Sequence, residues 1–353
     1  MKPTKILSLL TTLLLLFSAC SGNSDNNTTT PKQEVDKINE YISFTVSYLA
    51  SYDEVNDNAK YGAAVYEYDL QSREIAEIFN FPLNTQYALG VYDKKTNSVY
   101  YSKEKNNNSY ERQGKGDQIY VYNLVTASDT MLTDDLLAVN YIIPVDGNLF
   151  FLAARQNNPN LILGKIDLSD GNITYWDEEK TTASRILSID RIQRRIYVAI
   201  YDSDEERIAI EAHYKTADAV LIPVTHTIYS YNYDLSDKQE VLSKTNMRIK
   251  AVYAMDNRLM YRVDDTVSSY PDTTTTSEVI DLSNMEVLLL SEEPFSEGGS
   301  FTLDMKGVYV LDNIGENIGI CYYDFEMQEY TPVVAYNFGN NYFGIANFQL
   351  IHE

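Results

Sequence analysis

One phrase occurs six times along this 353-residue sequence. Each copy is an apolar or aromatic run, then Asp or Asn, then Leu or Phe, a few polar residues and a second apolar run. The Asp or Asn can end a strand and accept hydrogen bonds from the backbone of the turn that follows. The phrase therefore predicts six capped β-hairpins, and such a repeat indicates a repeat architecture. The anchor residues are Asp69, Asn123, Asp167, Asp234, Asp281 and Asp324.

A second hairpin alternates with the first. Each copy is an apolar strand, a short turn and another apolar strand. Tight hairpin turns need backbone with positive φ, which Asp-Gly, Asp-Asn and Lys-Gly pairs suit. Such pairs occur at Asp146-Gly147, Asp256-Asn257 and Lys306-Gly307. The five complete copies span 88–102, 140–154, 185–200, 249–263 and 300–313, and a sixth begins within 342–353.

One period therefore contains four antiparallel strands, which we letter A to D. Four strands in roughly 40 to 50 residues are typical of a β-propeller blade. The sequence opens with strands C and D (61–80) and closes with A and perhaps B (342–353), so the two ends are expected to share a blade. We predict an all-β, six-bladed propeller closed by pairing of N- and C-terminal strands. Seven blades are the alternative if 42–51 or 203–227 holds further strands, and a β-sandwich is another.

The phrase Tyr66-x-Tyr68-Asp69-Leu70, repeated at 120–124, resembles bacterial six-bladed propellers of the TolB-like, YVTN and NHL-like groups. The resemblance covers about residues 61–353. It implies a propeller fold, while such rings bind proteins, glycans or peptides and some catalyse. The single tryptophan, Trp176, does not indicate a WD-repeat scaffold.

The N-terminus has the pattern of a lipoprotein signal. Lys2 and Lys5 precede an apolar run of about a dozen residues, which is too short for a permanent membrane helix. The run ends in Phe-Ser-Ala before Cys20, which resembles a bacterial lipobox. We therefore predict a signal peptide (1–19), a lipidated Cys20, a flexible tether (20–40) and a propeller domain (41–353). An ordinary secretory signal with a coincidental cysteine, or a retained helix, is the alternative.

Charge and tyrosine content narrow the partner class. The formal net charge is −23, which argues against a nucleic-acid partner and against an anionic-membrane surface. The 30 tyrosines suit strands and half-exposed surfaces.

The remaining cysteine, Cys321, lies in an apolar run and is expected to be a buried, inert thiol.

The connections predict which end of the ring meets a partner. The A–B and C–D turns share one face of a propeller, and the B–C and D–A connections share the other. Four B–C connections are expected to be long, which favours a recognition surface over neutral drift of exposed loops. These are 103–117, 154–160, 203–227 and 264–276. The candidate contact residues are Tyr110, Arg112, Arg155, Tyr214 and Tyr270.

Catalytic signatures are few. His213 and His226 lie in one insertion, but their spacing of 13 matches no familiar metal motif, and we predict neither a metal site nor a cofactor. We therefore expect a lipid-anchored protein of the bacterial cell envelope, whose propeller binds a protein, peptide or glycan. It would lie in the outer membrane of a Gram-negative cell or on the outer face of the plasma membrane of a Gram-positive one. The alternative is a carbohydrate-active lyase or hydrolase with its site at the channel mouth.

Overall fold

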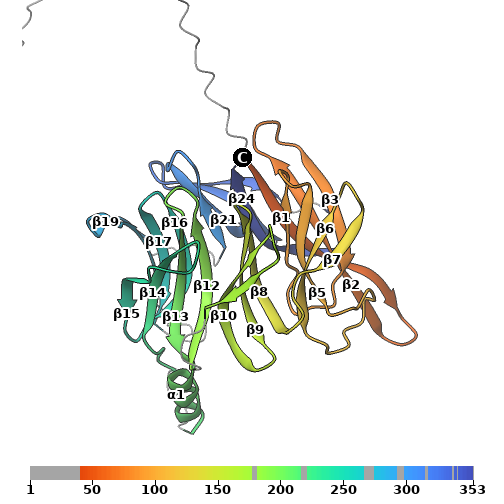
Figure 1. Ribbon diagram of the computed structural model, residues 1–353. Helices are drawn as coiled ribbons and strands as arrows, with labels where there is room; N and C mark the ends of the chain where they lie inside the picture. The colour runs from red at the N-terminus through yellow and green to blue at the C-terminus, as the bar shows by residue number, and fades with distance from the viewer. Residues whose placement is uncertain are drawn as a thin grey trace, which may run out of the picture. The chain divides into compact units, whose positions relative to one another are not determined.

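Six four-stranded antiparallel sheets form blades around a central axis in this computed structural model (Figure 1). The structure describes residues 40–352 apart from 177–180, 216–220, 266–273, 292–297, 315–316, 336–337 and 340. The prediction of an all-β, six-bladed propeller is confirmed, and the seven-bladed and sandwich alternatives are wrong. No helix in the described residues is long and apolar enough to cross a membrane.

The strands of the first three blades follow, from the axis outward. Blade I contains β24 (Tyr342–His352), β1 (Glu40–Asp53), β2 (Asn58–Asp69) and β3 (Ile75–Pro82). Blade II contains β4 (Gly90–Asp93), β5 (Ser98–Glu104), β6 (Asp117–Asn123) and β7 (Ser128–Met131). Blade III contains β8 (Leu136–Val145), β9 (Asn148–Arg155), β10 (Asn158–Asp167) and β11 (Ile173–Tyr175).

The remaining blades follow the same order. Blade IV contains β12 (Thr182–Asp190), β13 (Arg195–Asp202), β14 (His226–Asn232) and β15 (Gln239–Lys244), with helix α1 (Ser203–Lys215) between β13 and β14. Blade V contains β16 (Arg248–Met255), β17 (Arg258–Asp264), β18 (Thr275–Asp281) and β19 (Glu286–Ser291). Blade VI contains β20 (Gly299–Phe301), β21 (Gly307–Ile314), β22 (Asn317–Asp324) and β23 (Glu329–Val334).

Blade I closes the ring by pairing of N- and C-terminal strands, as predicted, but the two ends contribute other numbers of strands than expected. The C-terminal segment supplies only the innermost strand, β24, and the N-terminal part supplies the other three. β1 pairs with β24 from Glu40 opposite His352 to Tyr48 opposite Tyr342. The expectation that the chain opens with strands C and D at 61–80 is therefore wrong. The segment considered for a seventh blade, 42–51, lies in the second strand of blade I.

The hydrophobic core is divided among the six interfaces between neighbouring blades. Six clusters of buried side chains each join two adjacent blades, including the pair formed by blades VI and I. At that last interface Ile42 and Phe44 of β1 pack with Ile320 of β22 and Leu350 of β24. Because burial of apolar surface is the main stabilising contribution to folding, β24 holds the ring closed through packing as well as through pairing.

The six anchor residues cap their turns as predicted. In each copy the side-chain oxygen accepts a backbone N–H two residues later, as Asp281 does from Ser283 at 2.8 Å. Two predicted hairpin turns have positive φ at both central residues, Asp146-Gly147 and Asp256-Asn257. The third differs, because Met305 carries the positive φ there. The neighbouring Gly307 instead provides close approach, since a Cβ at that position would lie 2.3 Å from the carbonyl oxygen of Tyr323.

Tyrosines contribute to the sheets in the way their chemistry suggests. Several place the ring in the core while the hydroxyl reaches a carboxylate on a strand further from the axis. Tyr101 donates to Asp129 at 2.9 Å, and Tyr261 donates to Glu278.

Cys321 is buried, and burial, with a smaller contribution from Asp312, raises the pKa of its thiol to about 11. This thiol is therefore inert at neutral pH, as predicted.

Candidate functional site

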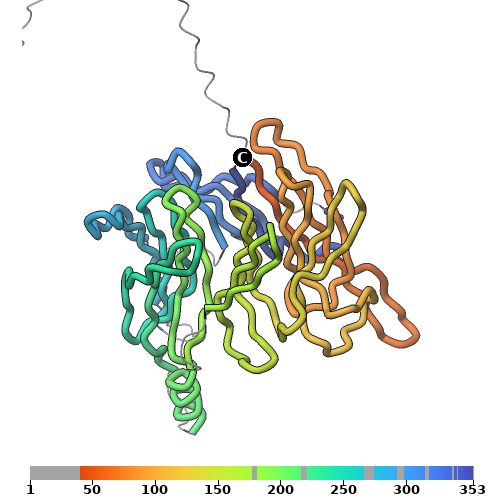
Figure 2. The backbone as a smooth tube through the Cα atoms, in the orientation of Figure 1, coloured from red at the N-terminus to blue at the C-terminus, as the bar shows by residue number. Residues whose placement is uncertain are grey.

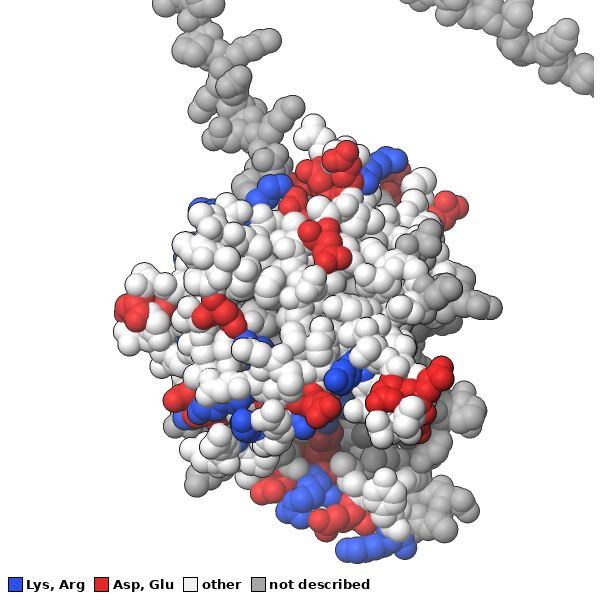
Figure 3. Space-filling view, turned by 90° about the vertical axis from the view of Figure 1, so that its right-hand side faces the viewer, with Lys and Arg blue, Asp and Glu red and all other residues white. Residues whose placement is uncertain are grey.

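The two ends of the ring differ in their connections. The A–B and C–D connections are short turns, and they lie at the end where β1 begins and β24 ends. We call the opposite end the B–C face. Figure 2 shows the β1–β2 hairpin and helix α1 projecting from this face, at the lower end of the view. Figure 3 shows acidic and basic side chains together at that end on one side of the molecule.

The B–C connection of blade II is a loop folded around a buried carboxylate. Glu104, the last residue of β5, is 0% exposed. Its oxygens accept the backbone N–H of Gln113 at 2.6 Å and of Lys115 at 2.7 Å, and the amide of Asn107. Burial raises the pKa of Glu104, but these hydrogen bonds outweigh burial and hold it below its ordinary value. The loop 105–116 therefore has a fixed shape set by an internal anion.

Further contacts tie the same loop to blade II. The Asn84 side chain donates to the backbone carbonyl oxygens of Asn107 and Ser109 at 3.1 and 2.7 Å. Asn84 also accepts the backbone N–H of Glu104 at 3.0 Å. The buried Asp117 accepts from the backbone N–H of Gln86 at 3.2 Å. The side chains of Asn84 and Glu104 thus hold the backbone of the loop through hydrogen bonds.

The B–C connection of blade IV begins with helix α1. The Asp202 carboxylate accepts the backbone N–H groups of Asp204 and Glu205, which is the geometry of a helix N-cap. Glu206 joins the helix to the sheet through an ion pair with Arg185, with Nη2 2.6 Å from Oε2. No described side chain of the helix is fully buried. The helix therefore stands on the B–C face with most of its surface exposed.

The β1–β2 hairpin extends beyond its inner partner. β24 begins opposite Tyr48, so the remainder of the hairpin up to the 54–57 turn pairs with no described strand on its inner edge. Exposed aromatic side chains gather near its base, where the rings of Tyr61 and Phe343 lie 5.6 Å apart. Tyr52, further along the hairpin, is 52% exposed.

The candidate contact residues are dispersed across the described part of this face. Tyr110 is 38% exposed on the 105–116 loop, and Tyr214 is 82% exposed on α1. Arg112 lies 3.4 Å from the buried Asp117, while Arg155 pairs with Asp135 and stacks over Tyr175. No hydrogen bond, ion pair or ring contact joins any two of these four residues.

Two other sequence assignments need comment. Tyr270 and most of 264–276 lie outside the described residues. The predicted long connection at 154–160 is wrong, because β9 continues to Arg155 and β10 begins at Asn158. Asn158 and Asn160 belong to the end of β10, where both are half-buried and Asn160 Nδ2 donates to Ser203 Oγ at 2.9 Å.

The two histidines of the 203–227 insertion lie in different surroundings. His226 starts β14 and is fully buried, with its ring stacked 4.9 Å from that of Tyr201. Burial, followed by the charges of Arg185 and Arg248, lowers the pKa of His226 to about 3. His213 instead lies on α1. Within the described residues no group of three or more His, Cys, Asp or Glu side chains could hold a metal ion.

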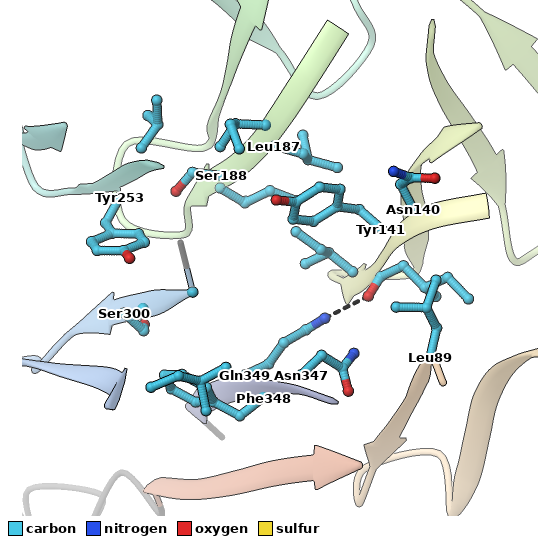
Figure 4. A pocket seen from close by; sticks show the side chains of 18 of the residues that line it. Leu89, Asn140, Tyr141, Leu187, Ser188, Tyr253, Ser300, Asn347, Phe348 and Gln349 are labelled. Carbon is cyan, nitrogen blue, oxygen red and sulfur yellow. Dashed lines mark hydrogen bonds between the residues drawn. The ribbon is translucent and has the colours of Figure 1, made fainter. Parts of the chain in front are cut away.

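The central channel is a second candidate site. Inner strands of the blades and the segment before β4 enclose a cavity of about 530 Å³. Among the described residues its lining includes three arginines, Arg185, Arg191 and Arg248, and no Asp, Glu, His or Cys. Figure 4 shows Tyr141 and Ser188 facing the cavity across from β24.

Sequence patterns could not identify this lining. Asn140 and Arg185 each fall at a β-bulge, where the register of β8 and of β12 shifts by a residue. A bulge breaks the in-and-out alternation of side chains and redirects one of them. The positions that face the channel therefore do not follow the period of two from which strand faces are predicted.

Comparison with known proteins agrees with the fold. No protein-family profile and no curated protein matches this chain. TolB from Acinetobacter baumannii is similar with a TM-score of 0.56 and 10% identity, over 88% of this chain and 66% of TolB. Nidogen in the nidogen/laminin complex gives 0.54 and 10%, over 88% of this chain and 98% of nidogen. Hydrazine synthase from Kuenenia stuttgartiensis gives 0.54 and 11%, over 89% and 47%.

These matches define the class of the protein. The chain is a six-bladed β-propeller, similar in fold to TolB and to other propellers. It spans slightly less than two thirds of the TolB chain. At 10 to 11% identity the similarity concerns the fold, and the site has to be argued from this chain's own residues.

Proposed function

We propose that this protein is a binding module of the bacterial cell envelope, anchored by a lipid on Cys20, whose B–C face captures a protein, peptide or glycan. The observation that carries the proposal is the loop 105–116. A buried carboxylate, Glu104, holds this loop in one shape while Tyr110 and Arg112 remain exposed on it.

A pre-shaped loop supports recognition for an energetic reason. Immobilising a flexible loop on binding costs conformational entropy, which reduces the affinity. Here that cost has been met during folding, and the loop presents side chains on a fixed backbone.

The position of the chain ends supports an orientation in which the B–C face points away from the membrane. β1 begins at Glu40, beside His352, at the end of the ring opposite the B–C face. A tether from a lipid at Cys20 would enter the propeller there, so the anchored protein would turn its B–C face away from the membrane. The tether and its anchor lie outside the described residues.

The nature of the partner follows from charge and from exposed aromatic groups. The net charge of −23 disfavours nucleic acid. Tyr and Arg are enriched where proteins contact each other, and aromatic rings also stack on sugars. The nidogen structure, whose propeller is similar to this one, is that of a complex with laminin, which lends support to a protein partner.

Site-specific photo-crosslinking in the native cells tests the proposal. A benzophenone amino acid replaces Tyr110 or Tyr214 on the B–C face, and Val125 or Met327 on C–D turns at the opposite end serves as the control. All four positions are exposed. We expect a discrete adduct from the first pair only. Adducts from the control pair alone, or equal adducts from both ends, would overturn the assignment of the face.

The anchor is tested separately. Replacing Cys20 by Ser removes the lipidation site, so the protein should move from the membrane fraction to the soluble fraction. Retention of the Cys20→Ser variant in washed membranes would contradict a lipid anchor at this residue.

A further inference from the structure

The channel has an electrostatic character opposite to that of the chain. The protein carries a net charge of −23, yet the described lining of the cavity holds three arginines and no carboxylate. One of them, Arg185, is neutralised by Glu206 of helix α1. Another, Arg191, has no carboxylate partner among the described residues.

Arg191 is a guanidinium inside the ring without a carboxylate partner. It follows β12 directly, and its Nη2 donates to the carbonyl oxygen of Pro144 at 3.2 Å. Within the described residues it makes no other hydrogen bond and no ion pair. The nearby Asp146 pairs instead with Arg194, at 2.5 Å. Burial lowers the pKa of Arg191, while more distant groups, including Tyr233 and Asp146, act in the opposite direction.

An arginine in this position is poorly satisfied. A guanidinium presents five N–H donors, and only one hydrogen bond to the protein uses them here. Arg191 is half-buried, and partial removal of a cation from bulk water is unfavourable unless an anion or several acceptors compensate for the lost hydration. The planar fork of arginine matches a carboxylate, which can accept two parallel hydrogen bonds.

The described lining of the cavity also offers two side-chain acceptors without a partner. Asn347 and Gln349 alternate on β24 and both line the channel. Gln349 spans the channel and donates to the carbonyl oxygen of Ile142 on β8 (Figure 4). The buried oxygens Asn347 Oδ1 and Gln349 Oε1 have no hydrogen-bond partner among the residues that the structure describes. A ligand that satisfies them must itself supply O–H or N–H donors.

Arg191 and the Gln349 amide are bonded to the same inner strand, β8. Gln349 bonds to Ile142 and Arg191 bonds to Pro144, two residues further along β8. Residues two apart on a strand are about 6.6 Å from each other. The cavity volume, about 530 Å³, falls within the range of roughly 300–1,000 Å³ that is usual for small-molecule sites.

We propose that the channel binds a small carboxylate that also carries hydroxyl or amide donors, with its carboxylate on Arg191 and its donors on Asn347 and Gln349. This chemistry is shared by acidic sugars and by short peptides with a free C-terminus. The site is independent of the partner proposed for the B–C face, because the residues that form it line the channel.

Calorimetric titration of the purified full-length mature protein tests the proposal with two matched pairs of probes. The first pair is a glucuronate-containing disaccharide and its neutral glucose counterpart. The second pair is the tripeptide Gly-Ser-Ala with a free C-terminus and the same tripeptide with a C-terminal amide. We expect one acidic probe to bind at least 10-fold more tightly than its neutral counterpart, and the pair in which this occurs identifies the source of the carboxylate.

Variants then locate the site. Arg191→Gln should weaken the acidic probe by about 10- to 150-fold, the equivalent of one charge-assisted hydrogen bond of about 1.5–3 kcal/mol. Asn347→Asp keeps the shape of the side chain but adds a negative charge beside the carboxylate, so it should weaken binding as well. Arg207→Gln is the control, because Arg207 is exposed on helix α1 and does not line the channel.

The results that would overturn the proposal are equally specific. They are a wild-type protein that binds neither acidic probe more tightly than its neutral counterpart, or full affinity in both Arg191→Gln and Asn347→Asp. If Arg191→Gln does not fold, as judged by circular dichroism, Asn347→Asp decides the question alone.

Discussion

The buried carboxylate of Glu104 allows the best-defined perturbation of the B–C face. Replacing Glu104 by Gln preserves the size of the side chain, but one acceptor oxygen becomes an NH₂ group. If that group takes the place of Oε2, it meets the amide of Asn107, which is also a donor. Asn107 cannot turn its amide over without cost, because its oxygen accepts from the backbone N–H and the hydroxyl of Ser109 at 2.9 and 2.7 Å.

The magnitude follows from the hydrogen bonds that change. One charge-assisted hydrogen bond, worth about 1.5–3 kcal/mol, is lost. The hydrogen bonds from the backbone N–H groups of Gln113 and Lys115 remain, but their acceptor is now neutral, so each loses about 0.5–1 kcal/mol of its stabilising energy. The closed form of the loop should therefore be destabilised by roughly 3 kcal/mol, which is about a 100-fold change in the opening equilibrium.

Hydrogen–deuterium exchange measures this equilibrium directly. The amides of Gln113 and Lys115 are hydrogen-bonded to Glu104, so their protection should fall about 100-fold in Glu104→Gln. Glu111→Gln is the matched control, since it makes the same chemical change on an exposed side chain in the same loop. Unchanged protection in Glu104→Gln, or an equal loss in both variants, would refute the assignment of Glu104 as the organiser of the loop.

Two further predictions concern the ring and the buried histidine. Ending the chain after Asn341 removes β24 and exposes the inner edge of β1, so the cooperative thermal transition seen by circular dichroism should be lost; an unchanged transition would contradict closure by β24. His226 has a folded pKa of about 3 against an ordinary value of about 6.5, so protonation favours unfolding, and its contribution to stability is lost as the pH falls below about 6.5. Between pH 7.5 and pH 5 the free energy of unfolding of His226→Phe should therefore rise by about 2 kcal/mol relative to that of wild type, as measured by urea denaturation. Stabilities of the two proteins that change in parallel with pH would argue against a neutral buried imidazole.

Features set by short-range chemistry were predictable from the sequence. The Asp or Asn that ends strand C caps a turn only two or three residues away, so Asp69 and Asp324 behave as their local sequence indicates. The same holds for Asp146-Gly147, where the turn type depends on two adjacent residues. Six such local units, repeated in order, were enough to predict the number of blades.

Features set by pairing across the whole chain were not predictable in the same way. β1 and β24 are about 300 residues apart in sequence, and nothing within residues 40–53 shows that this strand joins a blade whose inner strand comes last. Glu104 lies in a polar run that reads as a solvated loop, and its burial depends on donors that only the folded loop brings together. Arg191 reads as an ordinary turn residue, because its place on the channel depends on β8 of the preceding blade.

The affinity of this protein for the partner identified by photo-crosslinking tests the assignment of the recognition face most directly. The double variant Tyr110→Ala with Tyr214→Ala removes two exposed rings from the B–C face, and Val125→Ala with Met327→Ala removes two exposed apolar side chains at the opposite end. Truncation of a contact residue that matters costs more than about 1 kcal/mol. We therefore expect the first variant to bind at least 10-fold more weakly while the second binds like wild type. Equal affinity for all three proteins would contradict recognition through the B–C face.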